Sequence, residues 1–186
     1  MSATRKLIVL DRDGVINYDS DDYIKSVDEW RPLPGSIAAI ARLCAAGYRV
    51  AVISNQSGIG RGLLEVSALE RIHAKMIASI VATGGHLAGI YYCPHTPDDR
   101  CACRKPKTGM LRQLAADLSV PSFEGVPIIG DKISDLELAR AVGARGILVL
   151  TGKGSSTAAA LRDDADAEIY KDLASAVDAL LARSHS

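Results

Sequence analysis

The sequence predicts a doubly wound α/β protein, with a mainly parallel sheet and helices on both of its faces. Short apolar runs rich in β-branched residues alternate along the chain with segments of helical periodicity. Continuous apolar runs of this length are typical of strands buried on both faces of a parallel sheet. Such Rossmann-like sheets bind ligands beyond the carboxyl ends of their strands. Four runs end there in polar residues: Leu7–Leu10 before Asp11, Val50–Ile53 before Ser54, Ile90–Tyr92 before Cys93, and Ile128–Gly130 before Asp131.

The individual elements follow from local signals. Gly47, Gly84 and Gly143 each close a helical stretch, as is typical of helix C-termini, and the stretch over 65–82 repeats apolar residues at helical spacing. Ser36 is the expected N-cap of the first helix. The predicted strands are 7–10, 49–53, 89–92, 126–129 and 146–150; the predicted helices are 37–46, 65–82, 108–118 and 133–142, followed by two alanine-rich helical stretches, and a loop rich in aspartate covers 17–28.

Length and composition favour a small cytoplasmic protein. The 186 residues suffice for one domain, 1–186, and the motifs are too closely spaced for a large cap domain. Lys plus Arg and Asp plus Glu each total 22, so the neutral chain gives no reason to expect a nucleic-acid or membrane partner. No apolar run is long enough to span a bilayer, and the N-terminus leads into the first strand without room for a signal peptide. Without an obvious apolar surface stripe, we expect a monomer.

Asp11 and Asp13 stand two residues apart at the end of the first predicted strand. Two carboxylates this close repel one another unless a proton or a cation intervenes, and Mg²⁺ prefers such oxygen ligands together with phosphate oxygens. Asp11 is therefore a candidate nucleophile that forms an aspartyl-phosphate. Asp13, held protonated nearby, is the candidate acid that protonates the leaving alkoxide and later activates water. The alternative is a pair of strand-end aspartates that only caps a loop.

Three further segments add chemistry for phosphate and metal binding. The Ser54 hydroxyl and the next backbone N–H suit a phosphate oxygen, while Lys105 suits the transferring phosphoryl group and Arg104 a second anion. Asp131 is the expected third metal contact, and Asp135, in the first turn of the following helix, is either a ligand itself or a residue that contacts a ligand. The alternatives are an ordinary Ser/Asn turn, a solvated basic pair and, for Asp135, a favourable charge at a helix N-terminus.

Four potential zinc ligands lie close together in the loop after the third predicted strand. The pairs Cys93-x-His95 and Cys101-x-Cys103 suit tetrahedral Zn²⁺, and a set of four leaves no open position for water, which indicates a structural site. The cluster immediately precedes Arg104–Lys105, so we expect zinc to order the loop and position both cations. The alternatives are free thiols in a mobile loop, or disulfides, which a reducing cytosol disfavours.

Taken together, these motifs resemble the haloacid dehalogenase superfamily of aspartate-nucleophile phosphatases, and more narrowly the D-glycero-D-manno-heptose 1,7-bisphosphate 7-phosphatases, a group related to the histidinol phosphatases. The resemblance extends over about residues 6–154. It departs at Ser54, where the family often has threonine, and in the loop after Asn17, which is slightly longer than in some relatives. The segments that carry it are Leu10–Asn17, Ser54–Gly62, Tyr91–His95 and Cys103–Pro106.

The resemblance implies a magnesium-dependent phosphatase that removes the 7-phosphate of D-glycero-β-D-manno-heptose 1,7-bisphosphate, in the pathway to activated heptose for lipopolysaccharide. It implies that Asp11 is the nucleophile and Asp13 the acid/base, and that Ser54 and Lys105 stabilise the phosphoryl group. Asp11, Asp131 and the backbone carbonyl of Asp13 then hold Mg²⁺. The residues expected to bind this small sugar phosphate are Arg12, Asp19, Asp22, Tyr23, Asn55, Gln56, Ser57, Arg104 and Lys132.

Other functions share parts of this pattern. A histidinol-phosphate phosphatase, or an enzyme for the α-anomer of the heptose bisphosphate, would carry the same motifs. A receiver-like phospho-accepting domain also combines strand-end aspartates, a hydroxyl and a lysine on a doubly wound sheet, but it has no use for a zinc loop or a second catalytic carboxylate. A zinc-dependent nucleic-acid module does not fit a neutral chain, because binding to phosphate backbones needs a basic face.

Overall fold

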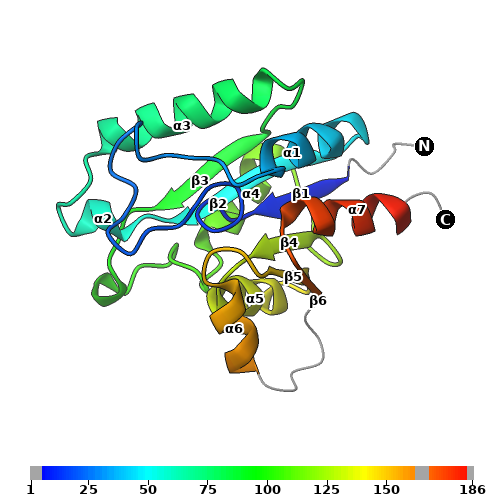
Figure 1. Cartoon of the computed structure of the whole chain (residues 1–186). Helices are drawn as coiled ribbons and strands as arrows, with labels where there is room; N and C mark the ends of the chain where they lie inside the picture. Colours follow the sequence, from blue (N-terminus) through cyan, green and yellow to red (C-terminus); the bar gives the residue numbers. More distant parts are fainter. Residues whose placement is uncertain (1–5, 162–167, 184–186) are drawn as a thin grey trace.

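The computed structural model describes residues 6–161 and 168–183 and confirms the predicted α/β architecture (Figure 1). Six parallel strands form one sheet in the order β3-β2-β1-β4-β5-β6. The N-terminal segment 1–5, expected to lead into the first strand, lies outside the described residues. The strands are β1 Leu7–Leu10, β2 Arg49–Asn55, β3 Gly89–Cys93, β4 Pro127–Gly130, β5 Arg145–Val149 and β6 Glu168–Tyr170; the helices are α1 Ser36–Ala45, α2 Ser57–Gly60, α3 Val66–Val81, α4 Gly109–Leu118, α5 Ile133–Ala141, α6 Gly154–Leu161 and α7 Leu173–Arg183, with a 3-10 turn at Pro97–Asp99.

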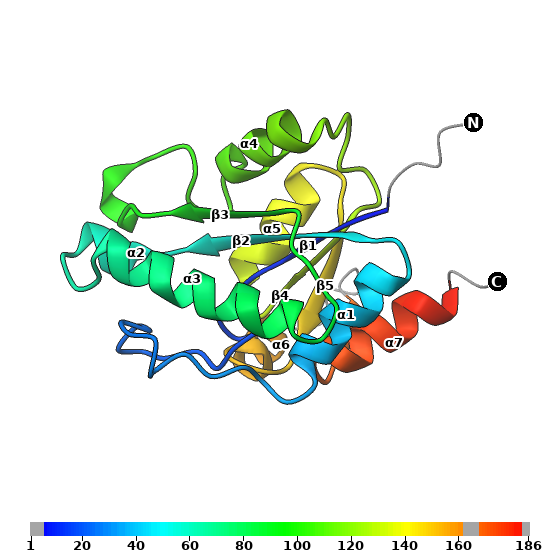
Figure 2. The same cartoon turned by 90° about the horizontal axis from the view of Figure 1, so that it is seen from above.

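The helices cover both faces of the sheet and create two hydrophobic cores (Figure 2). Alternate residues of the central strand β1 point to opposite faces. Ile8 and Leu10 therefore pack in the core beneath α1, α3 and α7, whereas Leu7 and Val9 pack in the core beneath α4 and α5. Because every residue of β1 is buried, the Asp11 that follows it starts from a fixed position.

The site is positioned by a reversal of strand order beside β1. The chain runs from β1 through β2 to β3 on one side and then continues with β4 to β6 on the other side. Crossover connections leave β1 and β4 in opposite directions, so a crevice opens beyond their carboxyl ends. Register pairs Leu10 of β1 with Ile129 of β4, which places Asp11 and Asp131 at the same edge.

Three local expectations were wrong or incomplete. Ser36 is not an N-cap: Gly35 occupies that position with φ 78°, and the buried Ser36 hydroxyl lies 2.6 Å from the Ile16 carbonyl and 2.8 Å from that of Leu33. The strand β6 was missed because its three residues are too few to show an alternating pattern. Residues 57–60, to which no element was assigned from the sequence, form the single helical turn α2. Within the described ranges, no helix has the length and apolarity needed to cross a membrane.

Candidate active site

Asp11 is the buried carboxylate at the end of β1. One of its oxygens accepts a hydrogen bond from the Arg12 backbone N–H at 2.7 Å and lies 2.9 Å from the Lys105 ammonium. Burial raises the pKa of Asp11 to about 7; Lys105 opposes this rise, and the nearby Asp135 and Asp131 add to it. An unaided Asp11 is therefore only partly ionised at neutral pH, and an added cation would favour the charged, nucleophilic form.

Asp131 lies fully buried beside Asp11 and is enclosed by backbone. Its Oδ2 accepts a hydrogen bond from the Lys153 N–H at 2.8 Å. A Cβ atom on Gly14 or Gly152 would lie 2.1 Å or 2.3 Å from the same oxygen, so only glycine fits at either position. Gly14 also has φ +82°, a left-handed conformation that glycine adopts without strain. The glycine of the Asp-x-Asp-Gly motif thus makes room for the second carboxylate.

The carboxylates of Asp11, Asp131 and Asp135 form a cluster that fits Mg²⁺. One oxygen of each lies within 4.8 Å of the others, and all three residues are buried. The Oδ1 of Asp131 is buried without a hydrogen bond, with the Lys132 ammonium 3.3 Å away. Mg²⁺ prefers hard oxygen ligands of this kind. The carboxylate of Asp13 is not part of the cluster, which agrees with the expectation that only its backbone carbonyl contacts the metal.

Lys105 lies between two carboxylates of this cluster, those of Asp11 and Asp135. Its ammonium lies 2.9 Å from Asp11 and 2.7 Å from Asp135, and the residue is almost fully buried. Burial alone would lower the pKa of Lys105, but the two carboxylates raise it, so the side chain stays charged. The Asn55 side chain donates to the Lys105 carbonyl at 3.2 Å and accepts from its N–H at 3.0 Å. Lys105 is therefore held by β2 as well as by its own loop.

Asp13 faces a set of hydrogen-bond donors instead of the metal cluster. Arg12 donates to it from Nε and Nη2, Asn17 donates at 2.8 Å and Gln56 at 2.9 Å. Burial alone would raise the pKa of Asp13, but the Arg12 guanidinium and these hydrogen bonds together hold it below its ordinary value. The expectation that Asp13 is held protonated is therefore wrong for the site without substrate, in which Asp13 is a carboxylate.

The four predicted zinc ligands come together as the corners of a tetrahedron. The Sγ atoms of Cys93, Cys101 and Cys103 and the Nδ1 of His95 lie 3.0 to 3.6 Å apart in the five pairs that are in contact. Tetrahedral ligands about 2.3 Å from a zinc ion lie about 3.8 Å apart. None of the three thiols forms a disulfide. The cluster therefore fits a structural Zn²⁺ with no open coordination position.

Arg104 continues directly from this cluster. Its backbone N–H lies 3.4 Å from the Sγ of Cys101, and its Nη1 donates to the His95 carbonyl at 3.4 Å. Both contacts connect Arg104 to zinc ligands, whereas Lys105 has the additional contacts with Asn55. The zinc loop thus positions the two cations unequally, and Arg104 depends on it more.

These groups surround a pocket of about 330 Å³. It brings together most of the predicted site residues, but Arg12 does not line it: the Arg12 side chain is completely buried and contacts Asp13, so a direct substrate contact was the wrong expectation. Asp22 lines a neighbouring depression, and Ser54 and Asp131 are buried and do not line the pocket. The predicted residues that line it are Asp11, Asp13, Asp19, Tyr23, Asn55, Gln56, Ser57, Arg104, Lys105 and Lys132.

The pocket also contains groups that the sequence did not single out, above all Lys153. Its ammonium pairs with Asp21, while Lys132 pairs with Asp19 at 3.0 Å. Two ion pairs thus fasten the aspartate-rich loop over the pocket. Lys153 lies in the loop after β5, so its signal was a further strand end, although it does not directly follow the strand as the four residues noted in the sequence do. Ile24 and Ser134 line the pocket without such a signal.

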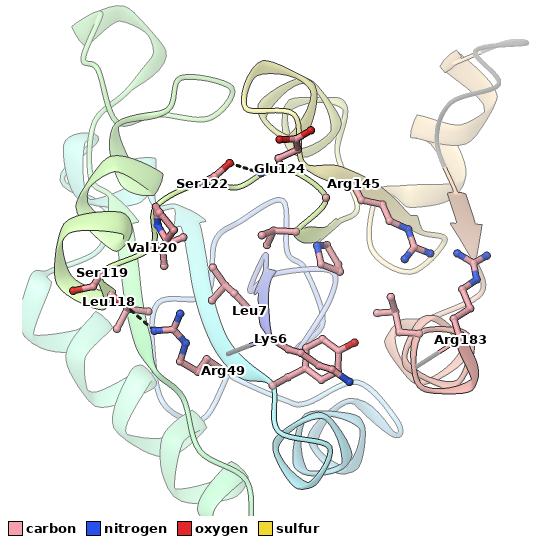
Figure 3. Close-up of a pocket in the computed structure, with 16 residues that line it drawn as sticks. Lys6, Leu7, Arg49, Leu118, Ser119, Val120, Ser122, Glu124, Arg145 and Arg183 are labelled. Carbon is pink, nitrogen blue, oxygen red and sulfur yellow. Dashed lines mark hydrogen bonds between the residues drawn. The ribbon is translucent and has the colours of Figure 1, made fainter. Parts of the chain in front are cut away.

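A larger cavity, of about 970 Å³, lies at the opposite edge of the sheet (Figure 3). Arg49, Arg145 and Arg183 lie around it, together with apolar side chains such as Leu7. Arg49 donates to the Leu118 carbonyl at 2.9 Å. This cavity contains no cluster of carboxylates, thiols or histidines that could hold a metal ion within the described part of the chain.

Comparisons with known proteins agree with this geometry. Residues 6–133 match the polynucleotide kinase 3 phosphatase family model, and residues 102–176 match the HAD-like hydrolase model. The chain is 52% identical to the D-glycero-beta-D-manno-heptose-1,7-bisphosphate 7-phosphatase of Pseudomonas aeruginosa, over 96% of this chain and 99% of that protein. The crystal structure of D,D-heptose 1,7-bisphosphate phosphatase from Bordetella bronchiseptica, complexed with magnesium and phosphate, superposes with a TM-score of 0.91 at 46% identity, over 96% of this chain and 99% of that chain. The corresponding enzyme from Burkholderia thailandensis has a TM-score of 0.73 at 40% identity, over 95% of this chain and 98% of that chain.

Proposed function

This chain belongs to the D-glycero-beta-D-manno-heptose-1,7-bisphosphate 7-phosphatases, within the haloacid dehalogenase-like hydrolases, and on that premise we propose that it hydrolyses the 7-phosphate of this sugar bisphosphate and leaves the 1-phosphate. The observation that carries the proposal is the buried cluster of Asp11, Asp131 and Asp135 beneath a pocket with cations at its rim. A phosphoryl group at the cluster and a second anion at the rim match the two ends of a sugar bisphosphate.

The first half of the reaction transfers the phosphoryl group to Asp11. A carboxylate oxygen of Asp11 attacks phosphorus, the bond between phosphorus and the sugar oxygen breaks, and Asp13 gives its proton to that oxygen. Lys105 and the Ser54 hydroxyl stabilise the charge on the phosphoryl oxygens. Mg²⁺, held by Asp11, Asp131 and the Asp13 carbonyl, relieves the repulsion among the carboxylates and neutralises phosphoryl charge. The negative charge of the bound substrate favours a proton on Asp13 for this step.

The second half releases inorganic phosphate. Asp13, now a carboxylate, takes a proton from water, and the resulting hydroxide attacks phosphorus and frees the Asp11 carboxylate. The donors around Asp13 already favour its charged form, which is the form that this step needs. The net reaction consumes one water and regenerates both aspartates in their starting forms. Asp135, the third carboxylate of the cluster, holds the Lys105 ammonium in place.

The anion at the far end of the substrate meets the cations at the pocket rim. Arg104, Lys132 and Lys153 all line the pocket. Arg104 offers a planar fork that suits a phosphate group. Lys132 and Lys153 pair with Asp19 and Asp21 in the absence of substrate. We expect the sugar to lie against the loop that carries these aspartates and Tyr23.

We further propose that the enzyme acts as a cytoplasmic monomer. Every group assigned to the reaction comes from one chain, so the site is complete without a partner. Sedimentation of the purified protein at micromolar concentration tests this: a single species of about 20 kDa is expected, and a stable dimer would contradict the proposal.

Steady-state kinetics with three substrates test the proposed activity. Purified protein with Mg²⁺ is given the β- and the α-anomer of the heptose 1,7-bisphosphate, and histidinol phosphate, and the phosphate released is measured. We expect the highest kcat/KM for the β-anomer, with the 1-phosphate retained in the product by phosphorus NMR. A preference for histidinol phosphate, or release of the 1-phosphate, would overturn the assignment.

A further inference from the structure

Gln56 lies between two groups assigned to the reaction, Asp13 and Ser54. It directly follows β2 and is 4% exposed. Its Nε2 is 2.9 Å from the Asp13 carboxylate and 2.5 Å from the Ser54 hydroxyl oxygen. The resemblance to known phosphatases predicted a substrate contact for Gln56, but these distances indicate another use of its amide.

Arg12 fixes which way the Gln56 amide faces. The Oε1 of Gln56 accepts from the Arg12 Nη2 at 3.3 Å. A guanidinium group has only donors, so the amide oxygen must face Arg12 and the amide NH₂ must face Asp13 and Ser54. Arg12 is itself fully buried and is fixed by its fork on Asp13. The amide therefore has one orientation in which every contact is a hydrogen bond.

This orientation determines the direction of the Ser54 hydrogen bond. The amide has two N–H groups, and one goes to Asp13 while the other goes to Ser54. The Ser54 oxygen accepts, so its own O–H must donate to something else, and no acceptor for it lies among the described residues. Gln56 has then used both of its donors within the protein, and its oxygen faces Arg12.

We propose that Gln56, oriented by Arg12, is a positioning residue that directs the Ser54 O–H toward the phosphoryl group and holds Asp13 for proton transfer. The proposal rests on the phosphatase activity proposed above, but not on the identity of the sugar. One amide thereby links phosphate binding to leaving-group protonation. The assignment replaces the predicted direct contact between Gln56 and substrate.

Gln56→Glu is the sharpest variant, because it keeps the shape and reverses the polarity at one atom. The new carboxylate accepts a hydrogen bond from the Ser54 O–H, which then points away from the phosphate. The same carboxylate repels the Asp13 carboxylate. Gln113→Glu makes the same chemical change on the exposed face of α4 and serves as the matched control. Gln56→Met, which removes the amide without adding charge, covers the case in which Gln56→Glu does not fold.

Two esters separate the proton-transfer effect from general damage. A sugar phosphate needs a proton on its leaving oxygen, whereas p-nitrophenyl phosphate releases p-nitrophenolate, which is a stable anion without a proton. We expect Gln56→Glu to lower kcat/KM by at least about 100-fold on the sugar phosphate and by about 10-fold on p-nitrophenyl phosphate. Gln56→Met should shift the same ratio in the same direction. Equal losses on both esters would overturn the assigned effect on Asp13.

A double variant tests the effect on Ser54. We expect Gln56→Glu to weaken the affinity for inorganic phosphate, with Mg²⁺ present, by about 10-fold in the wild-type background and by little in a Ser54→Ala background. Independent action would give the same loss in both backgrounds, and that result would overturn the proposal. A wild-type enzyme that prefers another sugar phosphate would refute the proposed substrate and leave both comparisons valid.

Discussion

A cavity lies at each end of the parallel strands, one at the carboxyl edge of the sheet and one at the amino edge. The smaller of the two cavities has the features of an active site. The cavity beyond the carboxyl ends of the strands measures about 330 Å³ and the one at the amino ends about 970 Å³. At the amino ends, Arg145 and Arg183 both pair with Glu168 (Figure 3 shows the two arginines). At the carboxyl ends, several carboxylates and Lys105 converge on one point. Convergence of charged groups, more than volume, therefore identifies the site.

The pKa values of carboxylates at the two edges also shift in opposite directions. Burial, with neighbouring acids, raises the pKa of Asp11 to about 7. Hydrogen bonds from Arg145 lower the pKa of Glu168 to about 2. The charged form of Asp11 therefore opposes folding, whereas the charged form of Glu168 favours it. One edge keeps an unfavourable charge arrangement that is useful for chemistry, and the other edge contributes to stability.

Among the variants that compare the two edges, Asp11→Asn should have the largest effect. An amide is a poor nucleophile, so turnover should fall by about 10⁴-fold or more. The metal-free variant should melt at a higher temperature than the wild type at about pH 8, because the raised pKa means that ionised Asp11 destabilises the fold there; the gap should close as the pH falls toward the unfolded value of 3.8. Asp28→Asn, an exposed change in the aspartate-rich loop to which no role is assigned, is the control for both measurements. Retained turnover, or a lower melting temperature at pH 8, would contradict the assigned role.

Loss of zinc should lower the catalytic activity less than loss of the nucleophile does. Cys101→Ser removes a ligand and should lower kcat/KM by about 10–100-fold. Most of this should appear as a higher KM for the bisphosphate, because Arg104 depends on the loop while Lys105 keeps its contacts with Asn55. Metal analysis should show zinc in the wild type and in the Cys44→Ser control. A zinc-free variant with unchanged KM would show that the loop does not position Arg104.

Asn55→Ala should affect kcat, whereas loss of zinc should mainly affect KM. It removes both hydrogen bonds that hold the Lys105 backbone, so kcat should fall by about 10-fold with little change in KM. Combined with Cys101→Ser, the loss should exceed the product of the single losses, because Lys105 then has neither anchor. Simple multiplication of the two effects in steady-state kinetics would mean that strand and loop position Lys105 independently.

The smallest effect should come from Glu168→Gln at the opposite edge. Activity should stay unchanged, and the stability at neutral pH should fall by about 1 kcal/mol through loss of an ion-pair network. Since its folded pKa is lowered from 4.5 to about 2, Glu168 stabilises fully above pH 4.5 and loses this contribution as the pH falls through 2. Thermal unfolding of the two proteins should thus converge in acid. A drop in kcat would show that the two edges are coupled.

The sequence predicted the strand ends well because buried parallel strands carry a strong local signal. The order of the polar residues after them located Asp11, Ser54 and Asp131 at one edge, and the short spacing of the cysteines located the zinc cluster. These inferences needed only local pattern and the topology rule for parallel sheets. The family resemblance supplied the roles.

What the sequence did not reveal depends on contacts between distant segments. From the sequence, Arg12 was expected to contact substrate in the pocket. In the fold it is buried against Asp13, which follows β1, and Gln56, which follows β2. The ionisation of Asp13 depends on those same donors. Lys153 enters the site only because β5 lies beside β4. The contacts of Arg12 and Asp13 with Gln56 have no periodicity or spacing that marks them along the chain.

The central place of β1 also has a consequence for biosynthesis. The nucleophile precedes Asp131 and Lys153 by more than half the length of this sequence, so it leaves the ribosome well before them. While the polypeptide is growing, Asp11 has neither its metal-binding partner nor Lys105, and the edge of β1 that receives β4 is open. Catalytic competence should therefore arise in one late step, when β4 inserts beside β1. Nascent or truncated chains that end before β4 should be inactive, and the open strand edge is the feature that a chaperone would need to shield.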